Sequence, residues 1–171
     1  RGLVGIEAET GRFLWGYNRV ANDVANIPTP IVLGDQVFAS TGYQTGSVLL
    51  ELERSGDGVK ARERYFLDSK TLQNHHGGLV LVGDYLYAGH GHNKGFPICV
   101  ELETGKVAWG GDIRNKGTDS ANVLYADGRI YYRYQNGVMI LIEASPGAYV
   151  EKGSFEIPDV AGPSWPHLAI A

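Results

Sequence analysis

One hairpin signal recurs three times along this chain of 171 residues, at intervals of 49 and 44 residues. Each copy consists of an apolar run, a two-residue turn made of Gly and Asp, and a second run rich in aromatic or β-branched residues. The three turns are Gly34-Asp35, Gly83-Asp84 and Asp127-Gly128. Turns of this composition accept the positive φ values that match the twist of two antiparallel strands. A repeat of about 45 residues built on such hairpins predicts a repeated, antiparallel β architecture.

A second signal interleaves with the hairpins and completes the repeat unit. Residues 5–15 recur as residues 99–109, which is 94 residues or two units further along, with weaker copies at 49–53 and 141–147. Each unit therefore contains four strands, which we label a to d in chain order. The 3.6-residue periodicity of a helix is not sustained anywhere in the chain. The pattern predicts an all-β fold, a β-propeller whose blades are four-stranded antiparallel sheets.

The repeat divides the chain, residues 1–171, into one propeller segment. Strands c and d of one blade are expected within residues 1–20, and strand a of a further blade at 166–171. Complete blades are expected at residues 26–66, 78–111 and 121–156. Because most propellers have more than four blades, we expect an arc of about four blades from a ring of seven or eight. An open arc exposes its end faces to pairing, so the remainder of the ring or a second copy of the chain is an expected partner.

Composition excludes several classes of protein. An apolar share of 43% with 20% charged residues is typical of a globular domain, and no apolar run reaches the length of a transmembrane segment. A net charge of −4 gives no electrostatic support for nucleic acid binding. The one cysteine, Cys99, excludes an intrachain disulfide and is expected to be buried in the apolar run 96–102. No charged-then-apolar leader precedes Leu3, so no signal peptide is expected within these residues.

The stretch Glu9–Arg12 followed by Trp15, and its copy Glu103–Lys106 followed by Trp109, resemble the repeat of pyrroloquinoline quinone (PQQ)-like β-propellers of the quinoprotein alcohol dehydrogenase-like superfamily. The resemblance covers essentially the whole chain. It implies a bacterial protein that is periplasmic or secreted, and it implies that the tryptophan of each copy docks one blade on the next. The residues that it assigns to blade docking are Gly11, Trp15, Gly105 and Trp109.

The same resemblance leaves two functions open. PQQ-dependent dehydrogenases of this class carry an adjacent cysteine pair facing the quinone and hold Ca²⁺ with Glu, Asn and Asp side chains. This chain has a single cysteine, and none of its residues matches the calcium positions, so no catalytic residue is assigned. The leading expectation is a non-catalytic binding or scaffold propeller without a cofactor. The alternative is a PQQ- and calcium-dependent dehydrogenase that oxidises alcohols or sugars.

Four of the five histidines lie within 18 residues, at positions 75, 76, 90 and 92. Continuing the strand register back from the Gly83-Asp84 turn places His75 opposite His92 and on the same side as His90, with His76 on the other side. Three neutral imidazoles that converge in this way could bind Zn²⁺, Cu²⁺ or Ni²⁺. The alternative is a glycine-rich loop whose imidazoles only form hydrogen bonds with neighbouring groups.

The histidines lie at the end of the blades where the b–c turns and the d–a connections meet. Aromatic and amide side chains of these loops suit a protein, glycan or small-molecule ligand. The candidate ligand-face residues are Tyr43, Gln44, Tyr134, Gln135, Trp165 and His167. For Trp165, which stands between two prolines, ordinary loop packing is the alternative. The recurring glutamates of the Thr-Gly turns are expected to line a solvated strand edge or to cap turns rather than to act in acid-base catalysis.

Overall fold

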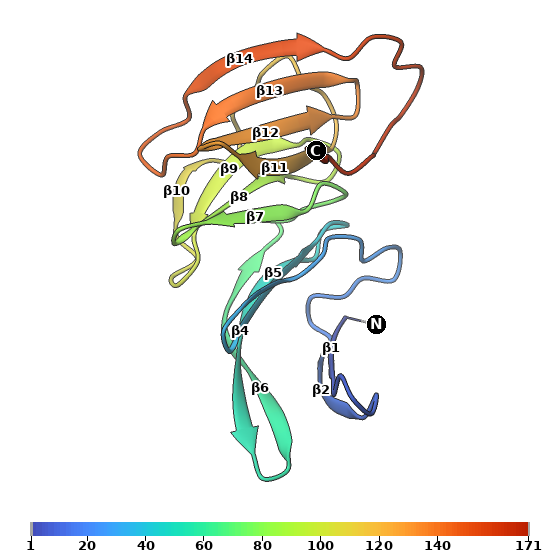
Figure 1. Ribbon diagram of the computed structural model, residues 1–171, viewed down its shortest axis with the longest axis vertical. Coiled ribbons are helices and arrows are strands. Elements are labelled where there is room, and N and C mark those ends of the chain that lie inside the picture. The colour runs from blue at the N-terminus through green and yellow to red at the C-terminus, as the bar shows by residue number, and fades with distance from the viewer. Residues whose placement is uncertain (1, 171) are drawn as a thin grey trace.

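The structure is a computed structural model that describes residues 2–170, and these residues form 14 strands and no helix (Figure 1). A two-stranded ribbon comprises β1 (Leu3–Ile6) and β2 (Phe13–Tyr17). Three four-stranded sheets follow. The first comprises β3 (Ile31–Leu33), β4 (Gln36–Thr41), β5 (Gly46–Ser55) and β6 (Gly58–Asp68), and the second comprises β7 (Leu79–Val82), β8 (Tyr85–His90), β9 (Phe96–Glu101) and β10 (Val107–Gly110). The third comprises β11 (Ala121–Ala126), β12 (Arg129–Tyr134), β13 (Val138–Glu143) and β14 (Glu151–Glu156). All neighbouring strands pair antiparallel in chain order. The predicted all-β fold of four-stranded blades is confirmed, and no helix of the described residues could span a membrane.

Each a–b hairpin closes at the turn that the sequence indicates. Gly34 and Gly83 have φ values of 59° and 57°, which suit the first central position of a type II′ turn. Asp127 and Gly128 both have positive φ, 49° and 71°, as a type I′ turn requires. The strands on either side pair without a bulge. Local turn chemistry therefore sets the register of the two inner strands in every complete blade.

The outer c–d pairs share a different geometry. Each pair has one register shift, a β-bulge or a similar irregularity, and bulges of this kind increase the local twist. In the ribbon and in the β9–β10 hairpin the connection is the Thr-Gly turn. Gly11 and Gly105 have φ values of 73° and 70° there, and the Thr10 and Thr104 hydroxyls donate to the Glu7 and Glu101 carboxylates. These two glutamates thus stabilise turns.

Three hydrophobic cores lie between successive sheets and hold the arc together. Alternation along each strand sends neighbouring residues into different cores. On β4, for example, Val37 packs in the core shared with the ribbon, and Phe38 packs in the core shared with β7–β10. Cys99, which is buried as expected, and Tyr87 face the core shared with β11–β14. Figure 1 shows the sheets following one another with the β1–β2 ribbon at one end and β14 at the other.

The two ends of the arc expose apolar side chains. Val4, Ile6 and Phe13 are exposed on the ribbon, and Tyr125 and Phe155 are exposed on the β11–β14 sheet. In the interior of the arc the corresponding faces are covered by the next sheet. The predicted exposure of the end faces is therefore present in the structure.

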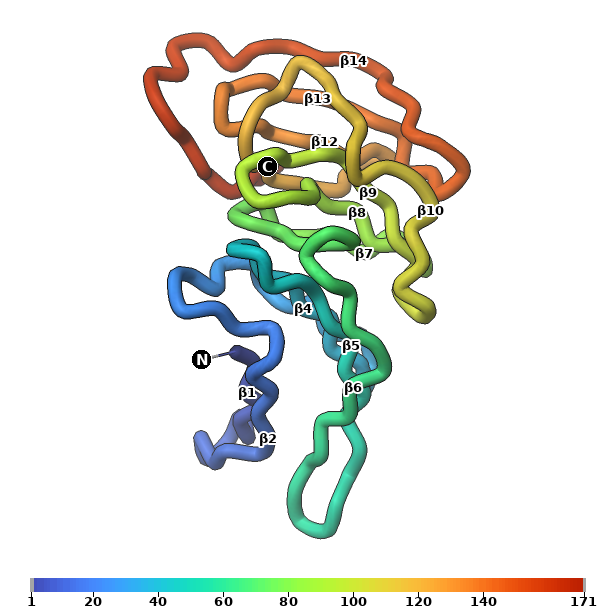
Figure 2. Tube along the Cα trace, turned by 180° about the vertical axis from the view of Figure 1, so that it is seen from behind, coloured from blue at the N-terminus to red at the C-terminus, as the bar shows by residue number. Residues whose placement is uncertain are grey.

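The predicted strand at 166–171 is not formed in its described part, residues 166–170. In the complete blades the strand at this position pairs with the strand that follows it, whereas residues 166–170 pair with no strand of the described chain. Without that partner its backbone groups have no ladder to join. The segment after β14 instead turns back and runs beside β11 and β12, as both views show (Figures 1 and 2). Position 171 lies outside the described residues.

Candidate functional site

The b–c turns and the β6–β7 connection form one hydrogen-bonded unit at one end of the blades. The backbone N–H of Tyr43 donates to Nδ1 of His92 over 3.3 Å, and the N–H of Gln44 donates to Oε1 of Gln73 over 3.0 Å. The N–H of Gly91 donates to the carbonyl of Gln73 over 3.0 Å. Tyr43 and Gln44 both have left-handed φ, 55° and 63°. Since non-glycine residues rarely adopt this conformation, the surrounding bonds must hold the turn in place.

Five rings from four loops pack in a continuous series of contacts at this end of the molecule. The ring centroids of Tyr43 and His92 are 4.4 Å apart, those of His92 and His75 are 4.0 Å apart, and those of His75 and His76 are 3.8 Å apart. Trp165 then stacks on His76 at 5.1 Å with an interplanar angle of 27°. We call Tyr43, His92, His75, His76 and Trp165 the ring row. It brings together side chains that are 122 positions apart in the sequence, from residue 43 to residue 165.

His75 is the buried centre of the ring row, with only 6% of its surface exposed. Its Nδ1 lies 2.9 Å from Oγ of Ser120, and its buried Nε2 has no hydrogen-bond partner. Burial, with repulsion from His76 and His92, lowers the pKa of His75 to about 4. The imidazole is therefore neutral at neutral pH.

His90 does not belong to the ring row. His76 occupies the position that the predicted register gave to His90. The His90 ring is buried and accepts a hydrogen bond on Nδ1 from the backbone N–H of Gln73 over 3.2 Å. Burial lowers its pKa. The predicted register does not extend to the histidines, because β7 pairs with β8 only as far back as Leu79. Just before that residue, Gly78 has a φ of +67° and turns the chain out of the strand.

The predicted metal trio of His75, His90 and His92 is consequently not assembled. Across residues 2–170, no group of three or more His, Cys, Asp or Glu side chains is arranged to hold a metal ion. The three histidines of the ring row pack ring against ring, tilted by 53° and 55°. The hydrogen bonds of His75, His90 and His92 to neighbouring groups match the alternative interpretation of this glycine-rich segment.

Two more of the candidate ligand-face residues, Gln135 and His167, lie next to the ring row. Trp165 is 49% exposed, and its indole N–H donates to Oε1 of Gln135 over 2.8 Å. The Nδ1 of His167 lies 3.3 Å from Nδ2 of Asn122 on β11. Gln135 and Asn122 thus tie the segment after β14 to the β11–β12 hairpin.

Tyr134 is different, because it lies in the core rather than on the loop face. It is 1% exposed, and its hydroxyl accepts a hydrogen bond from Nδ2 of Asn115 over 2.7 Å. Residues two apart on a strand share a face, so Tyr134 continues the buried face of Ile130 and Tyr132 on β12. The sequence prediction placed Tyr134 in the loop after the strand. It was wrong because β12 includes Tyr134 as its last residue.

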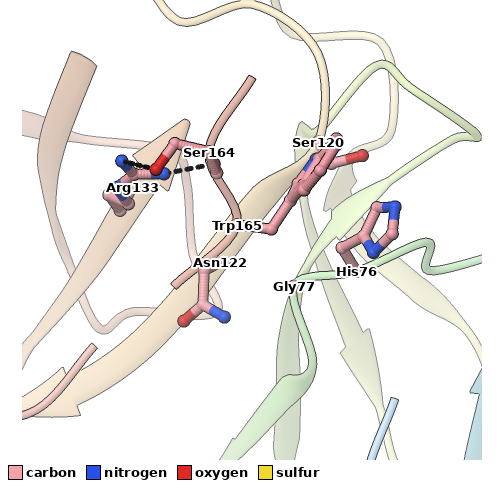
Figure 3. Close-up of a pocket in the computed structure, with 7 residues that line it drawn as sticks. All are labelled: His76, Gly77, Ser120, Asn122, Arg133, Ser164 and Trp165. Carbon is pink, nitrogen blue, oxygen red and sulfur yellow. Dashed lines mark hydrogen bonds between the residues drawn. The ribbon is translucent and has the colours of Figure 1, made fainter. Parts of the chain in front are cut away.

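A small pocket that the sequence analysis did not find opens beside the ring row (Figure 3). Its volume is about 190 Å³, much of it open to solvent. Arg133 lies on one side and donates two hydrogen bonds to Ser164. The lining residues are His76, Gly77, Ser120, Asn122, Arg133, Ser164 and Trp165. The signal for this pocket in the sequence is Arg133, a charged residue that stands between Tyr132 and Tyr134 within a strand.

Trp109 lies between two blades. Its indole N–H donates to the carbonyl of Ser145 in the next blade over 2.9 Å, and its ring contacts the Tyr149 ring at 5.8 Å between centroids. Trp15 is partly buried against the core that the ribbon shares with β3–β6. The tryptophans at these two repeat positions therefore face the neighbouring sheet, whereas Trp165 faces the ring row.

We expect the free energy of unfolding to decrease as the pH is lowered from 6.5 toward 4. His75 has a folded-state pKa of about 4 against an ordinary value of 6.5, so the unfolded chain binds the proton more readily. The contribution is complete above pH 6.5 and is lost as the pH approaches 4, at a cost of no more than about 3 kcal/mol. Burial lowers the pKa of His76 and His90 in the same direction.

Urea unfolding at a series of pH values measures this effect, with the His75→Gln variant as control. The variant should show a shallower loss of stability between pH 6.5 and 4 than the original protein. Parallel pH profiles for the two proteins would show that His75 does not carry the effect.

Comparison with known proteins agrees with the repeat and with the fold. A family model described as outer membrane protein assembly factor BamB matches residues 1–111. Among solved structures, BamB from Moraxella catarrhalis superposes with a TM-score of 0.60 at 15% sequence identity, over 89% of this chain. The chain spans 43% of the length of that protein, and at this identity the likeness shows the fold alone. No curated protein matches the sequence.

The family match covers 111 of the 171 residues and includes both Thr-Gly copies. The structure supplies the four-stranded antiparallel blades that such a repeat requires. The chain therefore belongs to the PQQ-like β-propeller family described as outer membrane protein assembly factor BamB.

Proposed function

We propose that this chain is part of a non-enzymatic scaffold propeller that binds a protein partner in the periplasm and serves the assembly of outer membrane proteins. The family description supports the setting. The observation that carries the proposal is the ring row, five rings held in fixed positions at the loop end of the blades.

The ring row has the chemistry of a protein-binding surface. Tyrosine and tryptophan are enriched at interface hot spots because each combines a large apolar surface with a polar tip. Trp165 is about half exposed, whereas Tyr43, His76 and His92 are partly buried. Hydrogen bonds fix Trp165 to Gln135 and the Tyr43 backbone to His92. A surface that is already ordered loses little conformational entropy when a partner binds.

We further propose that this function needs no quinone or calcium ion. Ca²⁺ takes six to eight oxygen ligands, usually with several carboxylates, and none of the described residues that line the pocket beside the ring row carries a carboxylate. Burial raises the pKa of the Cys99 thiol to about 11, and Cys99 lies inside the core between two blades. These residues do not fit the calcium and cysteine requirements of the dehydrogenases, so they support the scaffold function.

Site-specific photo-crosslinking in the cells that make the complete protein tests the proposal. A photoreactive amino acid placed at Tyr43 or at Trp165 should crosslink to the same protein partner. The matched controls are Thr10 and Thr104, which are exposed in the Thr-Gly turns at the opposite end of the blades. We expect no adduct from either control position.

Two outcomes would contradict the proposal. Adducts from the Thr-Gly turns alone would move the partner surface to the other end of the blades. Dye-linked oxidation of an alcohol or a sugar by the purified protein after addition of PQQ and Ca²⁺ would make it an enzyme.

A further inference from the structure

Arg133 is a buried cation without a counter-charge. It is 5% exposed, yet none of the carboxylates within residues 2–170 lies within ion-pair distance of it. Its protein partner is a neutral residue: Nη1 donates to the carbonyl of Ser164, and Nη2 donates to Oγ of Ser164 over 2.8 Å. A guanidinium has five N–H donors, so three of them form no hydrogen bond with residues 2–170.

Such an arrangement is energetically costly. Moving a charge out of water carries a large free-energy penalty, which is normally offset by an opposite charge and by complete hydrogen bonding. Burial lowers the pKa of Arg133, but arginine remains protonated in proteins. The positive charge therefore persists, and an anion is the group that would compensate it.

The surroundings of Arg133 supply further hydrogen-bond donors and no acid. The pocket includes the hydroxyls of Ser120 and Ser164, the Asn122 amide and the His76 imidazole (Figure 3). No protein group in the described chain forms a hydrogen bond with the His76 ring, which leaves its N–H free for a ligand. The Ser164 hydroxyl, the Asn122 amide and the His76 N–H can each donate to an anion. The Ser120 hydroxyl is already within hydrogen-bond distance of His75 and Asn93.

The size and shape of the pocket restrict the anion. Its free volume of about 190 Å³ is largely open, and the enclosed part has room for a single water-sized group, such as one oxygen of a carboxylate. Trp165 and His76 stack beside it with centroids 5.1 Å apart. A planar carboxylate matches the planar fork of a guanidinium and can enter a narrow site edge-on.

We propose that the Arg133 pocket binds a carboxylate group that a protein partner inserts beside Trp165. The inference rests on the proposed function, because the pocket borders the ring row and shares His76 and Trp165 with it. The carboxylate forms an ion pair with the Arg133 guanidinium. The rings of the ring row pack against the partner residue that bears this carboxylate. The shared chemistry is the carboxylate, whether it comes from an acidic side chain, a chain terminus or a free small acid.

NMR titration of the complete protein measures binding directly, with the Arg133 Nε–H and Trp165 indole N–H signals as reporters. The probes are acetate, acetyl-Ala-Ala-Asp-amide, acetyl-Ala-Ala-Ala with a free carboxylate, and acetyl-Ala-Ala-Ala-amide, which has none. We expect saturable shifts with the three carboxylates and none with the uncharged amide. Tighter binding of a peptide acid than of acetate would support a protein source. Equal affinity for acetate, or preference for inorganic phosphate, would overturn the assignment.

Arg133→Gln should weaken peptide-acid binding about tenfold or more. Arg129→Gln, at the other end of the same strand, is the matched control and should bind normally. Because Arg133→Gln removes the hydrogen bonds of a buried side chain to Ser164, Arg133→Lys provides a second variant that keeps the charge and loses the fork. It too should bind more weakly, and unchanged affinity in either correctly folded Arg133 variant would overturn the proposal.

The crosslinking experiment separates this inference from the proposed function. If the partner still crosslinks at Tyr43 while no carboxylate probe binds, the scaffold function stands and the carboxylate site is wrong. If carboxylates bind but no partner crosslinks at the loop face, the site exists and the proposed function is wrong.

Discussion

Replacing Gly77 with alanine is expected to lower the free energy of unfolding by about 3 kcal/mol. A Cβ atom at this position would lie 1.5 Å from the carbonyl oxygen of Ala121 and 2.4 Å from its carbonyl carbon. Both are backbone atoms, so no rotamer change can relieve the contact. The segment cannot simply move away, because the Gly77 carbonyl accepts a hydrogen bond from the N–H of Val123 over 3.1 Å. The substitution therefore separates two blades.

Urea unfolding followed by far-UV circular dichroism measures the loss. Gly153→Ala is the matched control, because Gly153 lies in β14 and a Cβ there would meet no atom within 4 Å. Its stability should change by no more than about 0.5 kcal/mol. Similar unfolding curves for the two variants would show that the contact between β11 and the segment before β7 does not hold these blades together.

Removing the Trp109 side chain is the second change with a large expected effect. Trp109→Ala should cost about 3 kcal/mol, because it leaves a cavity between two blades and removes the donor to the Ser145 carbonyl. The ring also loses its contacts with Tyr87 and Tyr149, whose centroids lie 6.0 Å and 5.8 Å away.

Trp165→Ala is the control for this prediction, since the Trp165 ring is about half exposed. It should lower stability by less than about 1 kcal/mol and should weaken partner crosslinking at Tyr43. Guanidinium unfolding followed by circular dichroism avoids dependence on tryptophan fluorescence. A larger loss of stability for Trp165→Ala than for Trp109→Ala would reverse the roles assigned to the two side chains.

The blades were predictable because each of their signals is local. A Gly-Asp or Asp-Gly pair sets a turn through its own φ preferences, and the turn then sets which residues of the two strands face each other. The hairpins at Gly34, Gly83 and Asp127 formed where they were expected for this reason. The Thr-Gly turns at Gly11 and Gly105 are local in the same sense.

The site was only partly predictable, because local signals weaken away from the turns. The loops that carry Tyr43, His75, His92 and Trp165 were correctly placed at one end of the blades, since strand order alone decides which loops meet there. The exchange of His90 for His76 followed from a single positive φ outside the strand.

The sequence by itself determined the repeat, the antiparallel pairing and the end of the blades at which the loops gather, because turn chemistry and alternation act over a few residues. Only the tertiary structure decided that Tyr134 is buried, that residues 166–170 form no strand and that the described residues lining the Arg133 pocket include no carboxylate. Each of these depends on what a neighbouring sheet or a distant segment places against the residue. Burial and pairing across blades are long-range properties, and a residue's own neighbours in sequence do not specify them.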